Sequence, residues 1–398
     1  MFRLAVLVLA LIAIFEFDAQ ADQLKGKVKA VAADKNEITV TVGKTDQQFT
    51  IPADAKVLNA AGKEIPQRLG AKLFQPGMQV VVTTDKVDGK DVVKELKLLD
   101  PFPPNGFLDT ADAGPDFLVQ GEYEGTIAGK GKLGAQVVAG GEGQFAVLFF
   151  AGGLPGAGWD GKTIEKAAAK TVDEKTAVTG KWHGAIASGK LTGKTADGEE
   201  FTLVRCVRHS STEGAKPPSG AVVLFDGSKV DEWNKGKIVD GEFLLAGATT
   251  KRAVGDFKMH LEFRLPFRDR DEGNSGVYMQ ERYELQIINS FGKFPPGNGG
   301  MASIYTQTPP SVNICFPPLS WQTYDIEFKA ARWDGNKKIS NARVTLLHNG
   351  VKVHDDADIK DKTGAGKPEG PQPLPIYLQH HGSPVYFRNV WLLVPSAS

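Results

Sequence analysis

The sequence predicts an all-β protein of three β-rich units, the last of which is a jelly-roll sandwich. Three observations lead to this prediction. Short runs of alternating apolar and polar residues recur along the chain, no stretch has a long helical period, and 45 Gly and 23 Pro in 398 residues supply many turns. The balance of 47 Lys and Arg against 47 Asp and Glu, with 41% hydrophobic residues, is typical of a globular protein. It gives no overall positive charge to attract nucleic acid or anionic membranes.

The first 21 residues have the features of a secretory signal peptide. Arg3 precedes an unbroken apolar run, Leu4–Phe15, and Ala19-Gln20-Ala21 has the small-x-small pattern of a cleavage site. This run is shorter than the roughly twenty residues that a membrane-spanning helix needs. We therefore expect a secreted or periplasmic mature protein that begins at Asp22 and has no membrane span. An uncleaved N-terminal anchor is the alternative.

Residues 22–101 predict a small β-barrel-like domain. An Asp88-Gly89 turn joins the last two of its strand-like runs, as in a β-hairpin. Phe49 is the single aromatic residue in these runs, whereas binding of single-stranded nucleic acid needs aromatic stacking platforms. A structural or interaction module is therefore favoured. The predicted strands are Leu24–Ala30, Glu37–Val42, Gln48–Ile51, Gln79–Thr84 and Val92–Leu98.

A Pro-rich linker, residues 102–116, leads to a middle β-rich domain at 117–210, and a second linker follows at 211–220. The Gly-rich run Gly152–Gly161 lacks the Lys and Ser or Thr of a phosphate-binding loop, so we interpret it as a turn-rich loop beside a packed Trp. The predicted strands are Val119–Ile127, Gln136–Ala139, Gln144–Phe150, Ala177–Thr179, Trp182–Ala187, Lys190–Thr195 and Glu200–Arg208.

Residues 221–395 show the clearest strand pattern. Alternation along Phe257–Leu265 predicts a half-buried antiparallel strand, with its five apolar side chains inside and Lys258, His260, Glu262 and Arg264 outside. Many strands without a long helix favour two packed antiparallel sheets, and so a jelly roll. The other predicted strands are Gly276–Gln280, Tyr283–Ile288, Thr323–Lys329, Arg343–His348, Pro375–Gln379 and Val385–Val394.

Two polar pairs in this region are candidates for a site. Glu284 and Gln286 share one strand face, opposite the apolar face formed by Tyr283, Leu285 and Ile287. Such a pair can line a concave sheet surface that binds sugar, or it can simply face solvent. If the later strand continues, Gln379 and His381 also share a face and His380 points the other way, which makes the two adjacent imidazoles a weak metal signature.

Several ordered segments of residues 221–395 resemble the 3-keto-disaccharide hydrolase domain family, formerly a domain of unknown function. They are Leu224–Gly227, Gly273–Tyr278, Tyr283–Ile287, Trp321–Ile326, Ala342–Thr345, His348–Val351, Pro375–Gly382 and Val385–Trp391. The resemblance implies a concanavalin-like jelly roll that acts on glycosides whose C3 hydroxyl has been oxidised to a ketone. The ketone acidifies the C2 proton, so a base can start elimination of the group at C1, and water then adds back.

The resemblance also implies roles for individual residues. His381 is the expected general base, and Glu284 is the alternative base, or a metal ligand if a divalent metal ion polarises the ketone. The expected substrate-binding residues are Asn274, Gln286, Gln379, His380 and Arg388, with Asn274 and Arg388 at the rim. The family usually has Asp where His380 stands, which puts a family-like metal site in question. A non-catalytic carbohydrate-binding or cell-surface interaction protein on the same sandwich is the alternative function.

Overall fold

The computed structural model describes residues 22–60, 62–100, 106–173, 175–267 and 273–395. The fold is nearly all β, with 51% strand and 3% helix. The predicted signal peptide lies outside the described residues. In the described part, no helix is long and apolar enough to cross a membrane. The chain divides into two compact units, residues 1–104 and 105–398. The all-β fold class predicted from the sequence is therefore confirmed.

The first unit is one six-stranded sheet in the order β3-β2-β1-β5-β6-β4, built around its own hydrophobic core. Asp88 and Gly89 both have positive φ and form the predicted turn between β5 and β6, because this turn type needs left-handed backbone. The short β4 pairs with β6 in parallel. The strands are β1 Asp22–Ala32, β2 Glu37–Val42, β3 Thr45–Thr50, β4 Lys56–Leu58, β5 Gln79–Val87 and β6 Lys90–Leu98.

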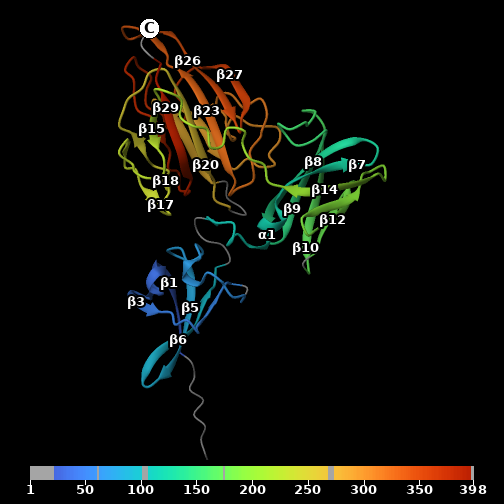
Figure 1. The fold of residues 1–398 in the computed structure, drawn as a ribbon, viewed down its shortest axis with the longest axis vertical. Helices are drawn as coiled ribbons and strands as arrows, with labels where there is room; N and C mark the ends of the chain where they lie inside the picture. The colour runs from blue at the N-terminus through green and yellow to red at the C-terminus, as the bar shows by residue number, and fades with distance from the viewer. Residues whose placement is uncertain (1–21, 61, 101–105, 174, 268–272, 396–398) are drawn as a thin grey trace, which may run out of the picture. The chain divides into compact units, whose positions relative to one another are not determined.

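The second unit begins with a short helix, α1 (Gly114–Val119), and a closed eight-stranded barrel (Figure 1). Large side chains such as Tyr123, Phe149 and Phe201 fill the barrel, so its interior is a packed core. The structure adds a strand, β10, whose Ala- and Lys-rich sequence has weak strand propensity; pairing with both β9 and β11 overrides that propensity. The strands are β7 Gly121–Ile127, β8 Gly131–Gly141, β9 Gln144–Ala151, β10 Ile164–Val172, β11 Lys175–Thr179, β12 His183–Ala187, β13 Lys190–Lys194 and β14 Glu200–Cys206.

Two antiparallel sheets form the C-terminal sandwich of the second unit. The larger has eight strands, β17-β18-β29-β20-β23-β26-β27 with β15 beside β29, and the smaller has five, β16-β19-β28-β21-β22. The hairpin of β24 and β25 is separate. The strands are β15 Val222–Phe225, β16 Trp233–Asn234, β17 Ile238–Val239, β18 Phe243–Leu245, β19 Thr249–Thr250, β20 Phe257–Arg264, β21 Asn274–Met279, β22 Tyr283–Ile288, β23 Trp321–Lys329, β24 Arg332–Asp334, β25 Lys337–Ser340, β26 Ala342–His348, β27 Val351–Ile359, β28 Tyr377–Leu378 and β29 Tyr386–Leu393.

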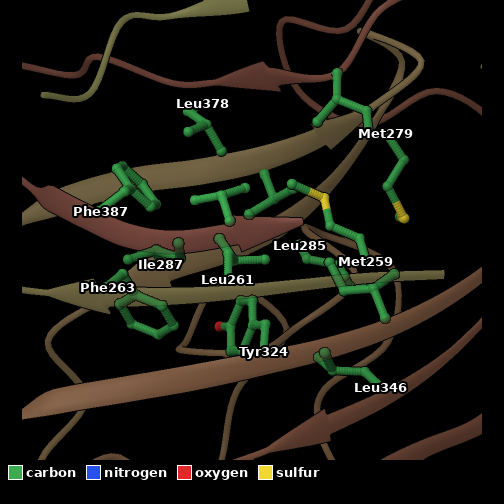
Figure 2. Close-up of a cluster of buried hydrophobic side chains, with 14 of the residues drawn as sticks. Met259, Leu261, Phe263, Met279, Leu285, Ile287, Tyr324, Leu346, Leu378 and Phe387 are labelled. Atoms are coloured by element: carbon green, nitrogen blue, oxygen red, sulfur yellow. The ribbon is translucent and has the colours of Figure 1, made fainter. Parts of the chain in front are cut away.

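The sandwich core lies between the inner faces of these two sheets. Figure 2 shows Leu261 and Phe263 of the larger sheet among Leu285, Ile287 and Leu378 of the smaller one. The face predicted for Phe257–Leu265 is confirmed, because all five apolar side chains are at most 1% exposed. Side chains that point away from this core lie on the outer face of their sheet, and these outer faces carry the polar residues considered below.

The middle of the outer face of β20 is not open to solvent as predicted, although Lys258 on the same face is exposed. His260 and Glu262 are 0% and 1% exposed, because part of the segment predicted as a linker covers them. The Gly214 amide donates to Glu262 Oε1 at 2.6 Å, and Ser210 Oγ lies 2.6 Å from Thr323 Oγ1 on the neighbouring strand. We call residues 210–215 the strap. Sequence alternation separates the core face from the outer face, but it cannot show that another segment covers the outer one.

Candidate functional site

The candidate site lies on the outer face of the smaller sheet, where the strand register places Glu284 and Gln286. Glu284 is directly opposite Tyr278 of β21, and Gln286 is opposite Gly276. Residues opposite each other in an antiparallel pair project to the same face, so these four residues share the outer face. Glu284 and Gln286 are 2% and 3% exposed, so this is not a solvated strand face. Tyr377 of β28 is opposite Tyr278 and extends the row.

A loop and an edge segment cover Glu284. The Glu284 amide donates to Thr363 Oγ1 at 2.6 Å, and the Tyr305 amide donates to the Glu284 carbonyl at 3.1 Å. A Cβ placed on Gly364 would lie 3.1 Å from the Tyr305 ring and 3.3 Å from Tyr278 Oη. The loop at 363–364 therefore packs on the two tyrosines beside the carboxylate, which explains how a residue on the outer face becomes buried.

The Glu284 carboxyl group has an unusual electrostatic environment. Tyr278 Oη donates to Glu284 Oε2 at 2.7 Å. Burial raises the pKa of Glu284 to about 7, and the Tyr278 hydrogen bond opposes this by stabilising the carboxylate. No cation among the described residues forms an ion pair with this carboxylate. Glu284 is thus able to gain or lose a proton near neutral pH, which general acid–base chemistry requires.

Gly276 makes room for this carboxyl group. A Cβ at position 276 would lie only 2.3 Å from Glu284 Oε1 and 3.0 Å from its carboxyl carbon. The carboxyl group of Glu284 therefore leans across β21 and lies over the glycine. Any larger residue at 276 would displace it, so the Gly in this strand positions the acid.

Three side-chain oxygens on this face are buried without a hydrogen-bond partner among the described residues. They are Asn274 Oδ1, Gln379 Oε1 and Ser303 Oγ. Asn274 is two residues from Gly276 on β21. The main-chain amide of Gln379 donates to the Gly276 carbonyl. The main-chain amide of Gln286 donates to the Ser303 carbonyl at the edge of the sheet. A buried oxygen without a hydrogen bond costs about 1–3 kcal/mol, so this face has a capacity for hydroxyl groups that protein contacts do not use.

We predicted that His381 shares a strand face with Gln379, but in the structure His381 lies beyond the end of the strand. The strand β28 ends at Leu378, and the chain bends so that the His380 amide donates to Tyr377 Oη at 3.1 Å. His380 and His381 are both exposed. His381 makes no hydrogen bond to any residue that the structure describes. Gln379 stays beside the site, with its Nε2 3.5 Å from Tyr278 Oη.

Arg388 lies elsewhere, so its prediction as a rim residue is wrong. It belongs to β29 in the larger sheet and projects from the outer face of that sheet, on the opposite side of the core from Glu284. Its guanidinium donates to Glu262 at 2.6 Å and to Glu213 of the strap at 2.7 Å, and lies 4.0 Å from the Trp321 ring centre. These contacts give Arg388 a structural role.

Sequence reasoning missed three residues that surround Glu284, and it left the metal question open. Tyr278 could have been found, because alternation places it on the same face as Gly276. Tyr305 and Thr363 come from irregular segments, whose sequences have no periodicity to indicate a face. In the described part of the chain, no three His, Cys, Asp or Glu side chains gather as a cation site.

Comparisons with known proteins identify the C-terminal domain. Residues 220–393 match the model of the 3-keto-alpha-glucoside-1,2-lyase-like domain family. No curated protein matches the chain significantly. Similar solved structures include three putative glycosyl hydrolases from Parabacteroides distasonis. One is 30% identical, with a TM-score of 0.40, and the match covers 45% of this chain and 85% of that one.

The other two are 17% and 21% identical, with TM-scores of 0.34 and 0.32. These matches cover 48% and 44% of this chain, and each covers 99% of the other protein. The family match spans the jelly roll and includes every strand of the candidate site. The C-terminal domain of this chain, residues 220–393, therefore belongs to the 3-keto-alpha-glucoside-1,2-lyase-like domain family, as its sequence resemblance predicted.

Proposed function

We propose that the C-terminal domain cleaves glycosides whose sugar carries a ketone at C3. In this reaction a base removes the C2 proton, and the electron pair of that C–H bond forms an enolate with the C3 carbonyl. The enolate then expels the group at C1, whose oxygen takes up a proton, and leaves a C1–C2 double bond conjugated with the ketone. Addition of water, with hydroxide to C1 and a proton to C2, completes a net hydrolysis. The family membership and the chemistry of Glu284 support this proposal.

Glu284 is the general base of the proposed mechanism, and its buried position is the observation that carries it. A carboxyl group with a pKa of about 7 is available as carboxylate at neutral pH and holds a proton firmly enough to return it to C2. Tyr278 holds Oε2, and Oε1 lies over Gly276. Glu284 takes the role first assigned to His381, because the imidazole is exposed and makes no hydrogen bond among the described residues that would fix its position.

The neighbouring polar groups orient the sugar in this mechanism. Asn274 Oδ1 and Gln379 Oε1 accept hydrogen bonds from sugar hydroxyls, which supplies the partners that these buried oxygens do not find among the residues that the structure describes. Burial raises the pKa of Tyr278 well above its usual value, so the phenol remains a proton donor near the developing charge. Gln286 is opposite Gly276 in the same row, and its Oε1 accepts a hydrogen bond from the Ile287 main-chain amide at 3.0 Å.

The alternative of a non-catalytic sugar-binding protein needs exposed aromatic rings as stacking platforms. Of the four Trp side chains in the C-terminal domain, Trp333 lies on the separate β24–β25 hairpin and is partly buried, and the other three are already engaged. Trp233 is 3% exposed, Trp391 stacks on His260, and Trp321 lies between the guanidinium groups of Arg264 and Arg388. The enzyme is therefore the better-supported reading of this domain.

The direct test is turnover of a panel of 3-keto-glucosides by wild type and Glu284→Gln. Loss of a general base lowers kcat by roughly 100- to 10,000-fold. His381→Asn serves as the matched control and should keep at least half of the wild-type rate. Full activity of Glu284→Gln would overturn the assignment of the base. Absence of turnover in the wild type, with or without chelator, would overturn the proposed function.

We also propose that the protein is exported. The charged start, the apolar run and the Ala19-Gln20-Ala21 pattern support this. Expression of the full chain in a bacterial host, followed by N-terminal sequencing of the periplasmic fraction, should give a mature protein that begins at Asp22. Retention of the uncleaved chain with the membrane would contradict cleavage and favour an anchor.

A further inference from the structure

A second tyrosine lies beside Glu284, on the side of the strand away from Tyr278. At the edge of the smaller sheet, Ile304 forms an antiparallel bridge with Leu285 of β22, and both side chains are buried in the sandwich core. Their neighbours Tyr305 and Glu284 therefore both project to the outer face. The Tyr305 amide donates to the Glu284 carbonyl at 3.1 Å, which keeps the two residues level. Tyr305 thus extends the row of outer-face residues that contains Tyr278 and Glu284.

The rings of the two tyrosines approach each other above the site. A Cβ placed on Gly364 would lie 3.2 Å from Tyr305 Cε1 and 3.3 Å from Tyr278 Oη, so both phenols border the same point. Electrostatics agree with this placement. Burial is the main cause of the raised pKa of Tyr278, Glu284 adds to it, and so does the Tyr305 hydroxyl. The hydroxyl groups of both tyrosines therefore lie near the Glu284 carboxyl group.

The two phenols differ in the availability of their protons. Tyr278 is 3% exposed, and its hydroxyl already donates to Glu284 Oε2. A phenol has a single O–H, so Tyr278 has no second proton to give to a ligand. Tyr305 is partly exposed, and no group among the described residues accepts a hydrogen bond from its hydroxyl. Tyr305 can therefore give its proton to a bound sugar.

The backbone around Tyr305 is fixed by neighbouring segments. Thr306 has a φ of 64°, a left-handed conformation that is rare for a β-branched residue. The Thr306 amide donates to the Asn298 carbonyl at 2.7 Å, and Asn298 Nδ2 donates to the Thr306 carbonyl at 3.1 Å. Gln307 Nε2 donates to the Asp361 carbonyl at 2.7 Å, which ties this segment to the loop that covers the site. A strained conformation persists only where the surrounding structure fixes it, so the fold determines the position of Tyr305.

We propose that Tyr305 is the general acid that protonates the departing oxygen at C1 of the sugar. This inference deepens the proposed function and rests on it, because the proposed function places the C2 hydrogen at Glu284. The C2 hydrogen and the C1 oxygen are on neighbouring carbon atoms. The base and the acid must therefore lie on either side of one C1–C2 bond, and two adjacent residues of one row meet this requirement.

The two groups then transfer protons in a balanced cycle. During elimination the Glu284 carboxylate takes the C2 proton, the C1–O bond breaks, and the Tyr305 hydroxyl gives its proton to the departing oxygen. During hydration the Tyr305 phenolate takes a proton from water as the water oxygen bonds to C1, and Glu284 returns its proton to C2. Both side chains regain their starting states, and water is the only co-reactant.

The test compares two 3-keto-glucosides that differ only in the group at C1. A departing methoxide needs a proton, whereas 4-nitrophenolate is stable as an anion and needs none. Tyr305→Phe should therefore lower kcat for the methyl substrate by about 100- to 10,000-fold. It should change kcat for the 4-nitrophenyl substrate by no more than about three-fold, after the rate in buffer is subtracted. Turnover of the 4-nitrophenyl substrate also shows that the variant is folded.

Two other variants serve as references. Tyr377→Phe removes a phenol at the far end of the row, where Tyr278 separates it from Glu284, and should leave both rates unchanged. Glu284→Gln should lower both rates alike, because removal of the C2 proton is needed whichever group departs.

The outcomes separate this inference from the proposed function. If the wild type cleaves both substrates and Tyr305→Phe does not affect the methyl substrate selectively, Tyr305 is not the general acid and the proposed function stands. A wild type that cleaves only the 4-nitrophenyl substrate would likewise show that the site supplies no acid. If the wild type cleaves neither substrate, the proposed function itself fails.

Discussion

The two outer faces of the sandwich each bury a glutamate, and the two acids have opposite properties. Glu262 on the larger sheet is 1% exposed, and Glu284 on the smaller sheet is 2% exposed. The pKa of Glu262 is lowered to about 2, whereas the pKa of Glu284 is raised to about 7. Burial alone raises both. The difference lies in the partners that each carboxylate finds.

Glu262 is the centre of a charged network. It accepts hydrogen bonds from Arg388, from Asn389 and from the Gly214 amide of the strap, and His260 Nε2 lies 3.6 Å away. His260 in turn contacts Asp325 at 2.6 Å. These groups outweigh the cost of burying the charge. Glu284 has the Tyr278 hydroxyl as its side-chain partner. A buried acid whose charge is fully paired stabilises the fold. A buried acid with one neutral partner can still gain or lose a proton near neutral pH.

Of the substitutions that distinguish the two faces, Glu262→Gln should cause the largest loss of unfolding free energy. The substitution leaves Arg388 and His260 near a neutral amide in a buried network, and breaking a buried ion pair typically costs about 3–5 kcal/mol. Glu284→Gln removes no ion pair and should change stability at pH 7 far less, or increase it. Urea unfolding of both variants at pH 7 gives the comparison. Equal losses would show that the two faces do not differ in this way.

The pH dependence of stability should have opposite signs for the two acids. The folded-state pKa of Glu284, about 7, exceeds its ordinary value of 4.5. Its contribution to stability is therefore complete below pH 4.5 and falls by about 3 kcal/mol as the pH rises to 7. The folded-state pKa of Glu262, about 2, is below 4.5, so its contribution is present above pH 4.5 and is lost as the pH falls towards 2.

Unfolding free energies between pH 3 and pH 8 test this prediction. The stability of Glu284→Gln relative to wild type should rise between pH 4.5 and pH 7. A flat difference over that range would show that Glu284 ionises normally in the folded protein. The Glu262→Gln curve should approach the wild-type curve only at the acidic end, if the charged network is the source of its stability.

Tyr278→Phe should widen the difference between the two acids, because it removes the hydrogen bond that Tyr278 donates to the Glu284 carboxylate. The lost hydroxyl stabilises the carboxylate, so the pKa of Glu284 should rise further and the base limb of the pH profile of kcat/KM should move to higher pH. Tyr377→Phe, opposite Tyr278 in the same row but without a hydrogen bond to Glu284, is the control and should leave that limb in place. An unchanged profile for Tyr278→Phe would remove the tyrosine from the mechanism.

The smallest loss of stability is expected from replacing an acid on the outer face that remains exposed to solvent. Glu327 on β23 pairs with Lys258 at 3.1 Å, and both side chains are about half exposed. Glu327→Gln should cost no more than about 0.5 kcal/mol, because solvent screens an exposed pair. A loss comparable to that of Glu262→Gln would mean that charge on this sheet matters generally, independent of burial by the strap.

Residue alternation determined the faces of the strands. It separated Phe257, Met259 and Leu261 from the outer face of β20, and it put Glu284 with Gln286 because a pleated strand allows one register when one face is buried. The segments that resemble the family also marked the correct domain. These features depend on neighbours in sequence, so they can be derived without a structure.

Tertiary structure alone decided which outer faces became buried and what each acid met there. The strap over Glu262 and the loop at Thr363 over Glu284 come from distant parts of the chain, and neither carries a periodic signal. The end of β28 put His381 outside the strand, and the placement of β29 in the larger sheet put Arg388 on the far side of the core. A pKa depends on solvent access and on partners within a few ångströms, and both are products of long-range packing.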